Sequence, residues 1–178
     1  DPEKTKRVRE ALPDAVFTTW PRFRSGLKRA LSSKVALPVV PVSTSGYSGT
    51  PLPKKLGLKP DGVLRALAAP REFAQALGEL PSGARILSRA GKDYDVAVVF
   101  ATKEREMEQR FDKLLPGLRS GRSIWIAWPK KASGVLTDIT EDTVRGRGLE
   151  AGVVDNKVCA ISDVWSGLRL VHRVENRR

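Results

Sequence analysis

The sequence predicts an α/β protein, a Rossmann-like three-layer αβα sandwich built on a mostly parallel sheet. From about residue 47 onward, short apolar runs alternate with amphipathic stretches of helical period, which is typical of strand–helix–strand units. Two of the apolar runs, residues 95–100 and 123–128, are almost continuous. Such runs are typical of strands that are buried on both faces of a parallel sheet.

The first half of this region predicts two helices and two strands. Pro51 opens a short helix, because proline suits a first helical turn, and Gly57 ends it. A strand is expected over residues 63–67 and a second over 85–88. Between them, four apolar side chains recur at helical spacing over residues 71–80, namely Phe73, Ala76, Leu77 and Leu80.

The second half continues the alternation and then reverses it. A charged helix is expected over residues 103–115, between the strands at 95–100 and 123–128. Thr140 begins a further helix, with acidic residues in its first turn, and Gly152 ends it. The last two strands, residues 153–161 and 168–174, predict an antiparallel pair joined across residues 163–167.

Net charge is the unusual feature of the composition, with 32 Lys and Arg against 20 Asp and Glu, or +12. Residues 1–45 hold nine basic and four acidic residues, and Pro13, Pro21, Pro38 and Pro41 interrupt any long periodic pattern there. We therefore expect a domain over residues 46–178 and a basic, proline-containing extension over 1–45, with short helices near 3–12 and 24–31. The extension is either disordered and without a role of its own or an arm that contacts nucleic acid.

Several classes of protein are disfavoured. The only cysteine is Cys159 and the only histidine is His172, so the sequence predicts no disulfide framework and no four-ligand zinc site. Cys159 lies in an apolar run and is expected to be a packed thiol. No run approaches the roughly 20 apolar residues that a membrane span requires, and no secretory signal is visible. We therefore expect a cytoplasmic protein with no membrane partner.

The C-terminal half has a distinctive order. The run LLPGLRSGRSIWIAW (114–128), followed by a helix, a strand and a reversed last strand, resembles the C-terminal half of class I methyltransferases. The resemblance implies that the last strand inserts antiparallel. Those enzymes carry a glycine-rich loop after their first strand, whereas Leu67 is followed here by Ala68, Ala69 and Pro70.

Two further departures concern the second strand. It ends at Ser88 and Arg89 rather than at an acidic residue that would hold a ribose, and too few residues precede Asp95 for a helix. We therefore expect a shortened methyltransferase-like sheet that lacks one βα unit. No cofactor is expected, and S-adenosylmethionine (AdoMet) in particular is disfavoured.

Several unusual strings resemble another family more closely. They are YSGTPL (47–52), KLG (55–57), WPKKAS (128–133), TD (137–138), VDNKVCAI (154–161) and WSGLR (165–169). In this order they resemble an uncharacterised bacterial family, domain of unknown function 3052, over about residues 47–176. The resemblance implies a bacterial protein with the fold above, and it brings no activity or catalytic residues with it.

A ligand site is expected where the parallel strands end, because open α/β sheets bind ligands outside the carboxyl ends of their strands. Three loops meet there, residues 68–71, 101–103 and 129–133. They supply the candidate ligand-binding residues Arg71, Thr102, Trp128, Lys130, Lys131 and Ser133. Two adjacent lysines and an arginine near a helix N-terminus suit an anionic group such as phosphate.

A polar stretch interrupts the strand expected at 153–161. Asp155, Asn156 and Lys157 are either a β-bulge that turns side chains toward a pocket or a simple turn, and they complete the candidate ligand-binding residues. No Ser/His/Asp set, phosphate-binding loop or metal cluster is recognisable, so no catalytic or metal-binding residue is predicted.

These observations rank three functions. The leading expectation is a non-catalytic module that binds an anionic, phosphate-bearing small molecule or partner. The first alternative is a basic protein associated with nucleic acid, whose binding would fall steeply with salt. The second is a divergent AdoMet-dependent methyltransferase.

Overall fold

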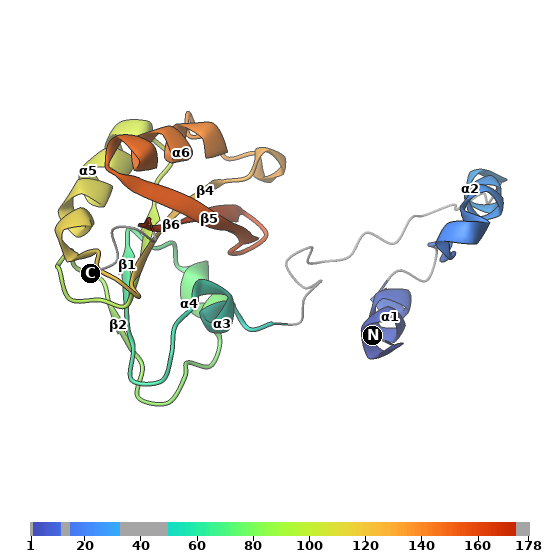
Figure 1. Ribbon diagram of the computed structural model, residues 1–178, viewed down its shortest axis with the longest axis horizontal. Coiled ribbons are helices and arrows are strands. Elements are labelled where there is room, and N and C mark those ends of the chain that lie inside the picture. The colour runs from blue at the N-terminus through green and yellow to red at the C-terminus, as the bar shows by residue number, and fades with distance from the viewer. Residues whose placement is uncertain (1, 12–14, 33–49, 174–178) are drawn as a thin grey trace. The chain divides into compact units, whose positions relative to one another are not determined.

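The computed structural model describes residues 2–11, 15–32 and 50–173 (Figure 1). The chain divides into two compact units, Asp1–Tyr47 and Ser48–Arg178. Residues 47–49, which begin the YSGTPL string, lie outside the described residues. So do residues 174–176, where the last strand and the family resemblance are expected to end.

The described residues of the N-terminal unit, 2–11 and 15–32, form the helices α1 (Pro2–Ala11) and α2 (Phe23–Ser32), with the 3-10 turn η1 (Trp20–Arg22) directly before α2. Thr18 packs against the buried Gly26 of α2, where a β-carbon would lie 2.6 Å from the threonine Cγ2. The Thr18 hydroxyl also donates to the carbonyl of Arg22 over 3.1 Å. The segment before α2 therefore folds back onto one side of that helix.

The larger unit contains one six-stranded sheet in the order β2-β1-β3-β4-β6-β5. The first four of these strands are parallel, and β6 is antiparallel to both of its neighbours. The predicted mostly parallel sheet with an antiparallel last strand is therefore confirmed. The strands are β1 (Val63–Leu67), β2 (Arg85–Leu87), β3 (Val96–Phe100), β4 (Ser123–Pro129), β5 (Val153–Ala160) and β6 (Trp165–His172).

Helices cover both faces of this sheet, which confirms the three-layer arrangement (Figure 1). One face packs against α5 (Glu104–Leu114) and α6 (Glu141–Glu150), and the other against α3 (Leu52–Leu56) and α4 (Glu72–Leu77). Short 3-10 turns follow α5 and β4, namely η3 (Leu115–Gly117) and η4 (Lys131–Ser133).

Strand β4 shows how the apolar sequence fills both layers. Ile124, Ile126 and Trp128 belong to the core beneath α5 and α6, while Trp125 and Ala127 belong to the core beneath α3 and α4. Successive side chains of a strand point to opposite faces, so a strand covered on both sides must be apolar throughout. The indole nitrogen of Trp125 donates to the carbonyl of Leu56 over 3.0 Å and ties α3 to the sheet.

The link from β2 to β3 contains no helix, as the sequence predicts. Because β1 lies between these two parallel strands, residues 88–95 must cross it. The guanidinium of Arg65 on β1 holds that crossing segment, donating to the carbonyls of Asp93 at 2.7 Å and Arg89 at 2.6 Å. Gly91 lies against the same guanidinium, where a β-carbon would be 2.7 Å from an arginine nitrogen.

The predicted start of the last strand is wrong. β6 begins at Trp165, and the connection from β5 is residues 161–164, so Gly167 lies within the strand opposite Cys159. A β-carbon on Gly167 would lie 2.7 Å from Cδ1 of Ile161, so this glycine permits close packing and makes no turn. Ser162 shapes the turn instead, because its hydroxyl accepts from the amides of Val164 and Trp165 at 3.2 Å.

Candidate functional site at the carboxyl edge of the sheet

Strands β1, β3 and β4 run parallel and end at the same edge of the sheet. β2 lies on one side of β1 and β3 lies on the other. The strand order therefore reverses between β1 and β3. Ligands of open α/β sheets bind outside such a reversal. The loops that follow β1 and β3 are therefore where a ligand site is expected.

Ala68, directly after β1, has a left-handed backbone with φ of 53°. An alanine in this conformation costs about 1–2 kcal/mol, and such strain concentrates at functional loops. The side chains of Ala68 and Ala69 are exposed. The loop thus makes, without glycine, a turn of the kind that a glycine adopts readily. From the sequence we expected that the missing glycine would keep a cofactor from approaching this backbone closely.

Three buried aromatic rings pack together at the end of β3. The ring of Phe100, the last residue of β3, meets Phe73 of α4 at 4.8 Å and Trp165 of β6 at 5.1 Å, edge to face in both cases. The indole nitrogen of Trp165 donates to the Glu72 carboxylate over 3.3 Å. The start of α4 is therefore held on the sheet by a rigid apolar cluster with one carboxylate at its margin.

Thr102, after β3, acts through its backbone. Its carbonyl accepts from the Thr137 hydroxyl at 2.9 Å and from the amide of Asp138 at 3.4 Å. The carboxylate of Asp138 in turn accepts from the amide of Glu104 at 2.8 Å and lies 3.7 Å from the Lys103 ammonium. Residues 137–138 are thus fastened over the beginning of α5.

The two candidate lysines after β4 differ in their surroundings. The Lys130 ammonium donates to the carbonyl of Ser162 over 2.7 Å, so this side chain ties β4 to the turn between β5 and β6. Lys131 is exposed. The Ser133 hydroxyl donates to the Lys130 carbonyl over 2.7 Å and closes the η4 turn. With the exposed Arg71 at the start of α4, these residues do share the carboxyl edge.

The other sequence-predicted site residues lie elsewhere. Trp128 is 8% exposed and packs in the core beneath α5 and α6. Asp155 to Lys157 contain a register shift, so of the two alternatives the structure has the bulge. Asp155 pairs with Arg145 at 3.3 Å, and the Lys157 ammonium donates to the carbonyl of Lys55 over 2.7 Å.

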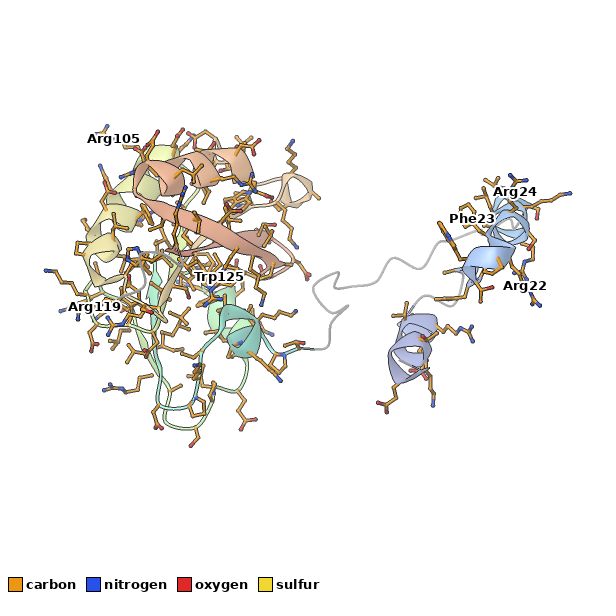
Figure 2. The ribbon with its side chains drawn as sticks, viewed as in Figure 1. Arg22, Phe23, Arg24, Arg105, Arg119 and Trp125 are labelled. Carbon is orange, nitrogen blue, oxygen red and sulfur yellow. The ribbon has the colours of Figure 1, made fainter. Side chains whose placement is uncertain are left out.

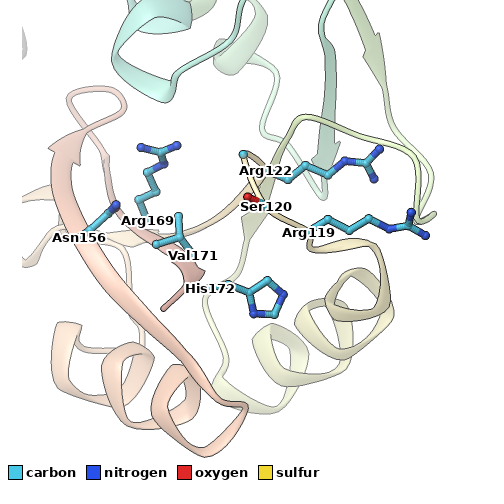
Figure 3. Close-up of a pocket in the computed structure, with 8 residues that line it drawn as sticks. Arg119, Ser120, Arg122, Asn156, Arg169, Val171 and His172 are labelled. Atoms are coloured by element: carbon cyan, nitrogen blue, oxygen red, sulfur yellow. The ribbon is translucent and has the colours of Figure 1, made fainter. Parts of the chain in front are cut away.

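Asn156 lines a pocket of about 360 Å³ near the opposite, amino edge of the sheet (Figure 3). Its lining is basic, and comprises Arg119, Ser120, Gly121, Arg122, Asn156, Arg169, Val171 and His172. The Arg122 guanidinium donates to the Lys92 carbonyl over 2.8 Å and lies over the Tyr94 ring. The sequence signal for this pocket was the RSGR turn before β4, which predicted only a loop.

The thiol of Cys159, near the carboxyl end of β5, and the phenol of Tyr94, on the crossing from β2 to β3, both have raised pKa values. Burial raises the pKa of the Cys159 thiol, an effect that the nearby ammonium groups of Lys157 and Lys55 partly oppose. Burial also raises the pKa of Tyr94 well above its usual value, against the opposing charges of Arg122 and Arg65. Both groups therefore stay protonated at neutral pH, so Cys159 is a poor nucleophile.

Within the described residues, no group of three or more His, Cys, Asp and Glu side chains is placed to hold a metal ion. No helix in that part of the chain is long and apolar enough to cross a membrane.

No protein-family model and no curated protein matches the chain. Solved structures do match. Precorrin-6y C5,15-methyltransferase from Geobacter metallireducens is 12% identical over 68% of this chain and 86% of its own, with a TM-score of 0.46. A SAM-dependent methyltransferase from Aquifex aeolicus is 13% identical over 66% and 85%, with a TM-score of 0.44. Magnesium protoporphyrin IX methyltransferase from Synechocystis with bound SAM is 12% identical over 68% and 74%, also at 0.44.

These matches are a likeness of fold. The matching structures are named as methyltransferases, one of them SAM-dependent and one with bound SAM. Two expectations from the sequence, a non-catalytic binding module for an anionic ligand and the absence of an AdoMet cofactor, are therefore given up, and the methyltransferase alternative is taken up below as a proposal. One reason for expecting no AdoMet cofactor was the absence of a glycine after β1, beside Pro70, the lack of an acidic residue after β2 and the missing βα unit. The left-handed turn at Ala68 answers only the first of these reasons.

Proposed function

We propose that the Ser48–Arg178 unit is a divergent methyltransferase that binds AdoMet at the carboxyl edge, outside β1 and β3. The observation that carries the proposal is the left-handed backbone of Ala68 at the point where the strand order reverses. Alanine gains nothing from this conformation in a folded chain, and a strained turn at a customary ligand position is a reason to infer a ligand there.

The residues present suit the cofactor in shape. Ala68 and Ala69 are small and exposed, so a ligand can approach the backbone of this turn closely. The cluster of Phe73, Phe100 and Trp165 is buried, at 3%, 1% and 9% exposed, so these rings would hold the start of α4 in place and would not contact the ligand themselves. A rigid site of this kind needs little rearrangement when a ligand binds.

The polar contacts between this chain and AdoMet would differ from those of class I methyltransferases, which use a glycine-rich loop and an acidic residue for the ribose. AdoMet brings a carboxylate, an ammonium, two ribose hydroxyls and a sulfonium that carries the transferable methyl group. Arg71 at the start of α4 is the candidate partner for the carboxylate, and Glu72 for a positively charged group. Ser88, after β2, stands where the acidic residue for a ribose is expected, and would supply a hydroxyl instead.

The family belongs to the same proposal. The resemblance of residues 47–176 to domain of unknown function 3052 supports a bacterial origin.

Isothermal titration calorimetry of the full chain with AdoMet tests the proposal. The wild type is expected to bind with a dissociation constant of roughly 1–100 μM, in the range of common substrate affinities. Ala69→Arg is expected to weaken binding at least about tenfold, because a long charged side chain then covers the turn without disturbing the core.

The matched control is Ala15→Arg, the same change at an exposed alanine of the other unit, which should bind AdoMet as the wild type does. No heat of binding at about 1 mM AdoMet, or equal affinities for wild type and Ala69→Arg, would refute the proposed site.

A further inference from the structure

The N-terminal unit exposes four large apolar side chains on one side of η1 and α2. Trp20 is 85% exposed, Phe23 46%, Leu27 47% and Leu31 80%. Their spacing of three, four and four residues places them along a single helical face. Scattered apolar side chains are ordinary at a surface, but a continuous stripe marks a surface that binds something.

The rest of the helix surface is basic. By helical spacing, Arg22, Arg24, Lys28 and Arg29 lie on the faces that the stripe leaves free, and residues 15–32 contain no Asp or Glu. Figure 2 labels Arg22, Phe23 and Arg24, where η1 meets α2. Helical spacing puts Arg24 and Lys28 along one border of the stripe, with Arg22 and Arg29 farther round the helix. The segment is therefore amphipathic, with a purely cationic polar face.

Contacts within the unit hold this geometry without covering the stripe. Thr18 packs against Gly26, which lies outside the row of Trp20, Phe23 and Leu27. The rings of Trp20 and Phe23 lie 5.4 Å apart, so the aromatic start of the stripe is itself organised.

We propose that η1 and α2 form an interfacial helix that lies on an anionic lipid surface. The aromatic and leucine side chains would enter the boundary between headgroups and acyl chains, and the arginines and lysine would meet the anionic headgroups. Nucleic acid would contact only the cationic face and would leave the apolar stripe in water. An anionic bilayer would both bury the stripe and contact the cationic face.

Tryptophan fluorescence provides a direct measurement. The chain has four tryptophans, and Trp125, Trp128 and Trp165 are only 0%, 8% and 9% exposed, so a change in emission on binding reports Trp20. With full-length protein, vesicles of phosphatidylcholine and phosphatidylglycerol are expected to shift the emission to shorter wavelength and to co-sediment the protein. Pure phosphatidylcholine vesicles should do so much less, and added salt should weaken the effect.

Variants separate the two faces. Phe23→Ser combined with Leu27→Ser is expected to weaken vesicle binding at least about tenfold, while Val135→Ser with Leu136→Ser, at exposed apolar positions of the other unit, should leave it unchanged. Arg24→Glu should weaken binding to anionic vesicles more than Arg105→Glu does. Trp20→Phe should keep co-sedimentation and lose most of the spectral shift.

Two results would overturn the inference. One is the absence of anionic vesicle binding by the wild type, including the case in which the same helix binds a short DNA duplex instead. The other is equal vesicle binding by the wild type and the Phe23/Leu27 double variant. Neither result bears on AdoMet binding, which involves the other unit.

Discussion

Single side chains hold the crossing from β2 to β3, which contains no helix, against its neighbours. Tyr94 is an example, since it lies on the helix-free crossing from β2 to β3 and its hydroxyl donates to the Leu114 carbonyl at the end of α5 over 2.9 Å. Gly117 packs against the same ring, where a β-carbon would come within 2.8 Å of it. The crossing segment is thereby locked against η3.

Tyr94→Phe should therefore lower the free energy of unfolding by about 1 kcal/mol at pH 7, since the Leu114 carbonyl loses its donor. The folded state raises the pKa of Tyr94, so its stabilising effect is present below the usual tyrosine pKa of about 10 and declines as the pH rises above that value.

Urea denaturation between pH 8 and 11 measures both effects. The wild type should lose more stability above pH 10 than the variant does. Parallel loss in the two proteins would mean that Tyr94 ionises as readily in the folded chain as in the unfolded one.

Residue roles were predictable where they are local. The Thr140 hydroxyl accepts from the amide of Thr143, and Gly57 ends α3 with φ of 89°, as their positions in the sequence indicate. The partners of Lys130 and Lys157 are carbonyls 32 and 102 residues away along the chain. No local pattern encodes such contacts, so the sequence could only identify both lysines as candidate ligand-binding side chains.

At the scale of elements, the crossing from β2 to β3 depends on Arg65. Its guanidinium donates to two carbonyls of this helix-free segment, and the fork geometry suits two acceptors at once.

Arg65→Ala should destabilise the protein by about 1–2 kcal/mol and should increase amide hydrogen exchange over residues 88–95. Arg65→Lys should recover only part of the loss, because an ammonium lacks the fork. The control is Arg105→Ala on the exposed face of α5, which should change the stability by less than about 0.5 kcal/mol. Wild-type exchange rates in Arg65→Ala would show that the crossing is held by other contacts.

Most element boundaries followed from the sequence, because buried strands and amphipathic helices have different periods. The start of β6 did not. Gly167 has the composition of a turn residue, but its role is to admit Ile161 and Trp125 close to the strand. Only the packed sheet shows which of these two uses a glycine serves.

For the whole molecule, the division at Tyr47 has a direct consequence. A chain without residues 1–47 should unfold within about 2 °C of the full protein in a thermal scan, since the two units form separate compact bodies, and a 1 kcal/mol loss would shift the midpoint by roughly 4 °C. It should also lose binding to anionic vesicles. Failure of the shortened chain to fold would show that the first unit contributes to the core of the second.

The order of strands was predictable as a class but not in detail. Alternating strands and helices imply a parallel sheet, and the resemblance to methyltransferases implies a reversed last strand. The conformation of the loop after β1 was not evident from the sequence. Without coordinates, a loop lacking glycine indicated a lost cofactor site, whereas the backbone of Ala68 adopts the left-handed turn regardless.

The most direct test is an NMR titration of the isotope-labelled full chain with S-adenosylhomocysteine, the demethylated product of AdoMet. We predict that the largest amide shift changes fall in residues 68–72 and 101–103, at the ends of β1 and β3. Changes confined to the arginine-lined pocket at the amino edge, or no changes at millimolar ligand, would contradict a cofactor site at the carboxyl edge.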